Sequence, residues 1–107
     1  MASLHTADGP RLAERAVLAI RADGTESVVT LAIGHPYAIS PTEWACPVRL
    51  DGLHHRLPDV RGIDAWQCLQ LCQALLAQLL RHFVDGGGRL YWTGTREPIA
   101  FGELMAS

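Results

Sequence analysis

The stretch from Asp64 to Val84 is the feature that most constrains how this chain of 107 residues can fold. Its apolar residues recur every three or four positions, so they gather on one side of a helix with roughly 100° between successive residues. Asp64 followed by Gln67 matches a helix-capping box, and Gly86 follows where helices commonly end. The sequence therefore predicts one long helix over about 64–84, which supplies much of the core.

Aliphatic and β-branched runs on both sides of this helix predict strands. Asp23-Gly24 and Asp51-Gly52 are turn signals between such runs. We expect an α+β fold, in which an antiparallel β-sheet of four to five strands has the helix packed on one face, in the order β-β-β-(β)-α-β. The predicted strands are 13–21, a central strand at 26–34, 44–51 and 89–94, with 53–57 as the optional fourth strand of that order.

Two further expectations concern the limits of the domain and the strand at 44–51. Asp8-Gly9-Pro10 interrupts regular structure, so we expect residues 1–11 to form a flexible N-terminal tail and 12–107 to form a single α+β domain. In 44–51 the apolar residues occupy alternate positions, which places Pro47 on the outer face of the strand, and a proline there suggests an edge position or a bulge.

Composition excludes several classes of function. All nine basic residues are arginine, which removes mechanisms that need a Schiff-base or phosphate-binding lysine. The arginines are scattered and the net charge is −2, so no nucleic-acid partner is expected. No apolar run predicts a membrane span or an export signal, and the three cysteines are then expected to be reduced thiols in the cytoplasm. Lysine and asparagine, whose codons are rich in A and T, are both absent, which suggests a GC-rich bacterial genome.

The outer face of the predicted helix is unusual because it carries no charge between Asp64 and Arg81. Solvated helix faces commonly carry pairs of opposite charges, whereas glutamine and alanine are easier to remove from water. This face is therefore predicted to bind a partner, with Trp66 as the main contact; the alternatives are coverage by the N-terminal tail or by a loop, and plain exposure to solvent. The predicted contact residues are Trp66, Gln67, Gln70, Gln73, Ala77 and Arg81.

Candidate chemistry is sparse. Cys46, Cys68 and Cys72 lie on apolar faces, and core packing is the interpretation we favour for all three. No metal-binding or catalytic motif occurs, so no cofactor is expected. The alternative is a small-molecule or metal-binding protein, or an enzyme, that uses His35, His54, His55 and nearby acids.

Several motifs together resemble a family of small bacterial proteins described as a domain of unknown function. They are Trp44-x-Cys46, Leu50-Asp51-Gly52-Leu53, the run Gly62-Ile63-Asp64-Ala65-x-Gln67-x-Leu69-x-Leu71, and Trp92. The resemblance covers roughly residues 13–94 and implies the α+β fold rather than an activity. The chain departs from the pattern at Cys68 and Cys72, where small aliphatic residues are usual.

These observations favour a non-catalytic protein that acts through association, either as a homodimer or with another protein. Small acidic bacterial domains of this shape often neutralise toxins, so an immunity-like role is included by analogy. The sequence does not identify the partner.

Overall fold

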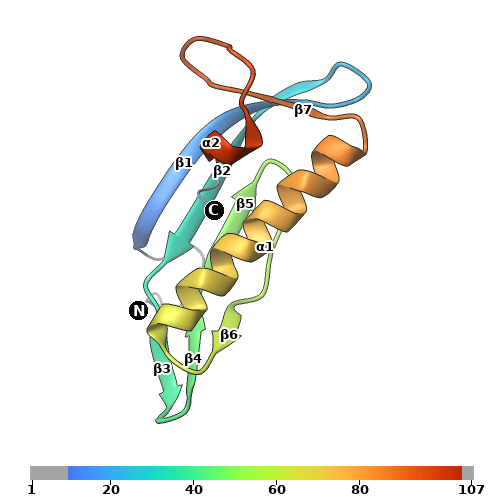
Figure 1. Cartoon of the computed structure of the whole chain (residues 1–107). Helices are drawn as coiled ribbons and strands as arrows, with labels where there is room; N and C mark the ends of the chain where they lie inside the picture. The colour runs from blue at the N-terminus through green and yellow to red at the C-terminus, as the bar shows by residue number, and fades with distance from the viewer. Residues whose placement is uncertain (1–9, 105–107) are drawn as a thin grey trace.

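The computed structural model describes residues 10–104, which form two antiparallel sheets, one long helix and a short second helix (Figure 1). The α+β class is confirmed. Residues 1–9 of the predicted tail lie outside the described residues, and its last residue, Arg11, begins the first strand. The elements are β1 (Arg11–Ile20), β2 (Glu26–Gly34), β3 (Tyr37–Ser40), β4 (Glu43–Cys46), β5 (Val48–Asp51), β6 (Val60–Gly62), α1 (Ala65–Asp85), β7 (Arg89–Tyr91) and α2 (Phe101–Leu104).

The larger sheet has four strands in the order β5-β2-β1-β7, and β2 is central as predicted. A turn at Asp23-Gly24 joins β1 to β2. Gly24 has a φ of +92°, which favours glycine, and the Asp23 carboxylate accepts a 2.9 Å hydrogen bond from the backbone N–H of Thr25. This turn sets the register of the long hairpin, in which Val17 lies opposite Val29.

The strand predicted at 44–51 is divided between two sheets, so the expectation of one sheet is wrong, although β5 does lie at an edge as the proline suggested. Pro47 separates β4 from β5, and β4 belongs to a second sheet of three strands in the order β3-β4-β6. Pro47 has no N–H to continue a strand ladder, although its carbonyl accepts a 2.9 Å bond from the N–H of Gly34, where β2 ends. Pro47 is also fully buried rather than on an outer face. Strand β2 therefore ends, and strand β5 begins, at the same level of the larger sheet.

The short strands differ most from the sequence expectation. Residues 53–57 form no strand, and the optional fourth strand is instead β6, which pairs with β4. Strand β3 lies between Pro36 and Pro41, where the sequence analysis expected no strand. The last predicted strand, 89–94, is reduced to the three residues of β7.

Helix α1 matches the prediction closely and lies across both sheets (Figure 1). It packs mainly against β4 and β6 and also contacts β2 and β7. The run of glycines ends the helix as expected: Gly87 has a φ of +101° and its N–H donates to the carbonyl of Val84 at 3.0 Å, while the N–H of Gly88 donates to the carbonyl of Phe83 at 3.0 Å. In the described part of the chain, no helix is long and apolar enough to cross a membrane. The buried stripe of α1 consists of Cys68, Cys72, Leu76 and Leu80.

Candidate functional site

The first turn of α1 is held by a reciprocal capping box. The Asp64 carboxylate accepts a 2.8 Å hydrogen bond from the N–H of Gln67, and the side-chain oxygen of Gln67 accepts one of 2.8 Å from the N–H of Ile63. This confirms the predicted cap. It also gives Gln67, one of the predicted contact residues, a structural task at the start of the helix.

The remaining predicted contact residues follow one side of α1. Trp66 is 74% exposed, and the neighbouring Ile63 is 64% exposed. Gln70, Gln73 and Arg81 are exposed, while Ala77 is half-buried. The helix therefore presents an aromatic side chain and then a row of uncharged side chains, as the sequence analysis expected for this face.

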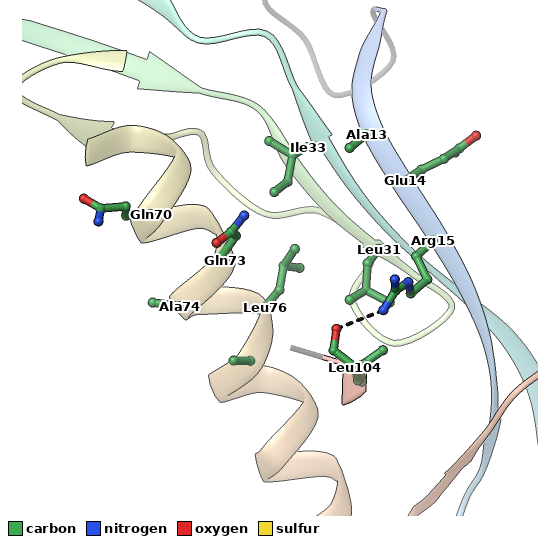
Figure 2. Close-up of a pocket in the computed structure, with 11 residues that line it drawn as sticks. Ala13, Glu14, Arg15, Leu31, Ile33, Gln70, Gln73, Ala74, Leu76 and Leu104 are labelled. Carbon is green, nitrogen blue, oxygen red and sulfur yellow. Dashed lines mark hydrogen bonds between the residues drawn. The ribbon is translucent and has the colours of Figure 1, made fainter. Parts of the chain in front are cut away.

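A groove runs between this side of α1 and strands β1 and β2, and we call it the β1–α1 groove (Figure 2). Its volume is about 590 Å³. Gln70, Gln73 and Ala77 thus come together at one concave surface, whereas Trp66, Gln67 and Arg81 do not line it. The lining residues are Ala13, Glu14, Arg15, Leu31, Ile33, Gln70, Gln73, Ala74, Leu76, Ala77 and Leu104.

The floor of the β1–α1 groove is apolar and its helical wall is uncharged. Leu31 and Leu76 are buried and Ile33 is half-buried, so aliphatic side chains form the base. Gln73 extends its amide from α1 toward β2, while Gln70 points away from the strands (Figure 2). A surface of this kind can take apolar groups and offers few polar partners.

Helix α2 lies at one end of the groove, where its last residue, Leu104, contacts Arg15 of β1. The Arg15 guanidinium donates a 3.0 Å hydrogen bond to the carbonyl of Leu104 (Figure 2). It also lies 5.5 Å from the centre of the Trp92 ring. Leu104 itself is buried. Arg15 therefore links α2 to the sheet, and its guanidinium already contacts the Leu104 carbonyl and the Trp92 ring.

The predicted cysteine positions are confirmed as core. Cys46, Cys68 and Cys72 are fully buried free thiols. Burial raises the pKa of Cys68. The pKa of Cys72 is also raised, mainly by its hydrogen bond with Cys46 and to a smaller extent by burial. Raised pKa values keep both groups as neutral thiols, which is how packed core cysteines behave.

The histidines of the alternative hypothesis are all exposed. None of His35, His54 and His55 lines the β1–α1 groove. Within residues 10–104, no three His, Cys, Asp or Glu side chains are grouped so that they could hold a metal ion. The acids near these histidines have other contacts: Asp51 pairs with Arg49 at 2.9 Å, and Asp59 accepts a 2.6 Å bond from the Tyr37 hydroxyl.

Sequence reasoning missed the strand side of the groove. Ala13, Arg15, Leu31 and Ile33 come from two different strands, and no local motif marks them. Only the helical wall had a sequence signal, namely the absence of charge.

Comparison with known proteins bears on the whole fold. The family model described as Domain of unknown function (DUF6968) matches residues 13–102. The chain belongs to this family. The DUF6968 match confirms that the chain belongs to a family of unknown function, and it includes most of β1 and all of β2 and α1, which line the groove. No curated protein and no solved structure matches the chain significantly. Membership in DUF6968 assigns no activity.

Proposed function

We propose that this protein is a non-catalytic binding protein that receives part of another protein in the β1–α1 groove. The observation that carries the proposal is the uncharged wall of α1 beside an apolar floor. From Ala65 to Leu80 the helix has no ionisable side chain other than the buried thiols of Cys68 and Cys72. Binding there removes no charge from water on the helical side, so desolvation costs less than it would on a charged helix face.

Trp66 supports the same proposal. It lies one helical turn before Gln70 and leaves 74% of its surface in water. Large exposed aromatic side chains beside a groove are typical of the residues that contribute most to protein association. A partner segment that fills the groove and continues past Gln70 would cover Trp66, so Trp66→Ala should weaken binding.

Site-specific photo-crosslinking in cells that naturally make the protein tests this surface. A photo-crosslinking amino acid would replace Gln73 in one variant and Gln78 in the other. Both residues are exposed on α1, but only Gln73 lines the groove, so Gln78 is a matched control. We expect a discrete adduct from position 73 and none from position 78.

The adduct from position 73 should also diminish when Trp66→Ala is added, while the melting temperature stays unchanged. An adduct mass equal to two copies of the chain would identify the partner as the protein itself. Equal adducts from positions 73 and 78, or no adduct from position 73, would overturn the proposal.

A further inference from the structure

The half of β1 beside the groove has a strand neighbour on one side only. Strand β2 pairs along the length of β1, from Arg11 to Ile20. Strand β7 pairs on the other side, but only with Leu18–Ile20. Within residues 10–104, Arg11–Val17 is therefore an unpaired sheet edge, which we call the open edge. Such an edge presents backbone N–H and C=O groups to any extended chain.

The open edge and the β1–α1 groove form one continuous surface. Side chains alternate along a strand, so Ala13 and Arg15 lie on the same face of the sheet as the buried Val17. Ala13, Glu14 and Arg15 all line the groove, but the Glu14 side chain points away from α1 (Figure 2). A strand added at this edge would direct every second side chain toward the groove. The small side chain of Ala13 leaves that path open.

We propose that an extended segment of a partner protein adds as a strand to the open edge and places alternate apolar side chains in the β1–α1 groove. This inference rests on the proposed function, because it specifies how the partner occupies the same groove. Backbone hydrogen bonds along the edge supply affinity, and the groove selects the side chains.

The chemistry of the groove defines the partner segment. The helical wall is uncharged and the floor is Leu31, Ile33 and Leu76, so a charge directed inward would lose water and gain no partner. Among the described residues that line the groove, Arg15 is the one cation, and it already donates a hydrogen bond to the carbonyl of Leu104. Groove-facing positions of the segment are therefore apolar and its other positions polar, which is the pattern of a strand with one buried face.

Charge complementarity argues against a second copy of this chain as the occupant. A two-fold axis pairs the edge with itself, and in antiparallel pairing the axis passes through one residue of the edge. With Ala13 on the axis, Arg11 lies opposite the Arg15 of the other copy; with Glu14 or Arg15 on the axis, each lies opposite itself. With Leu12 or Ala16 on the axis no like charges lie opposite each other, but only three residues of each open edge then pair. Like charges directly opposite each other destabilise a sheet, so antiparallel self-pairing along the open edge is disfavoured and a partner of different sequence fits it better.

Binding of a defined probe tests the mode of association. The probe is a fluorescent peptide of nine residues in which valine alternates with serine, with a terminal lysine for solubility. A control peptide has the same residues, but its two central backbone nitrogens are methylated, so that neither of its edges can pair continuously. We expect the full-length protein to bind the control at least about tenfold more weakly, because backbone bonds are lost.

Two protein variants form the matched pair. Ala13→Arg fills the path from the open edge into the groove, whereas Ala38→Arg makes the same change at an exposed alanine of β3. We expect Ala13→Arg to weaken probe binding by about tenfold or more and Ala38→Arg to leave it unchanged, with equal melting temperatures. Amide hydrogen exchange should show new protection at those amides of Arg11–Val17 that do not pair with β2.

The outcomes separate this inference from the proposed function. Equal binding of the two peptides, no binding of either, or protection outside Arg11–Val17 would overturn strand addition. Protection of the open edge in the free protein would also overturn it, since another part of the chain or a second copy would then cover that edge. If crosslinks from position 73 persist in any of these cases, the groove still binds a partner by another mode. Failure of both experiments removes both proposals.

Discussion

Removing the N-cap carboxylate by Asp64→Ala should destabilise the protein through α1. Two hydrogen bonds of 2.8 Å meet at this helix start, one from the N–H of Gln67 to Asp64 and one from the N–H of Ile63 to Gln67. The substitution deletes the first bond directly. It also removes a negative charge from the positive end of the helix dipole.

The expected loss is about 1 kcal/mol in the free energy of unfolding, the usual cost of replacing an N-cap by alanine. Asp64 is exposed, so water can solvate the freed N–H of Gln67 and the loss should not greatly exceed this value. For a domain of this length the entropy of unfolding is roughly 0.2 kcal/mol per kelvin, which converts the loss to a fall in melting temperature of about 4–5 °C.

Thermal unfolding followed by circular dichroism measures this shift, with Asp85→Ala as the matched control. Asp85 is the last residue of α1 and is also exposed, but it lies at the negative end of the dipole. We expect its removal to leave the melting temperature unchanged or slightly raised. Equal falls for the two variants would refute the capping argument, because loss of any surface carboxylate would then suffice.

Two further predictions concern the turn at Gly52 and the Tyr37–Asp59 pair. Gly52→Ala should cost about 2 kcal/mol in unfolding free energy, since Gly52 has a φ of +99° and an added Cβ would lie 2.7 Å from the carbonyl oxygen of Val28. The control Gly94→Ala meets no atom within 4 Å, and an equal loss by denaturant titration would contradict this reasoning. The hydrogen bond to Asp59 raises the pKa of Tyr37 to about 12, so the stability it contributes is complete below about pH 10 and is lost as pH rises through about 12. Tyr37→Phe should reduce this loss of stability between pH 10 and 12; an unchanged loss would contradict the assignment.

The parts of the fold that local residues determine could be predicted from the sequence. The capping residue, the apolar stripe and the terminating glycine of α1 all lie within the segment they specify, so its limits were predicted to within one residue. Strand β2 was predicted with its observed bounds for the same reason, because a turn signal precedes it and Gly34 closes it. The buried cysteines followed from their apolar positions.

The division into two sheets could not be predicted in this way. It depends on Gly34 and Pro47 lying against each other, although they belong to different strands; an added Cβ at Gly34 would lie only 2.9 Å from Pro47. A proline in an alternating run is also compatible with an edge strand or a bulge, so the sequence pattern alone did not show that the strand is divided at Pro47. The decisive contact is a tertiary one.

The candidate site combines a feature that the local sequence determines with a feature that depends on how distant strands pair. Its helical wall is visible in the sequence because charge is absent over sixteen consecutive residues of α1, from Ala65 to Leu80. The sheet edge beside the groove is open because β7 ends after three residues and leaves Arg11–Val17 without a second neighbour in the described chain. Had β7 continued along β1, the same glutamines and alanines would face a closed sheet, and a partner could use only side-chain contacts. The short last strand is therefore what allows this uncharged helix face to work together with a sheet edge.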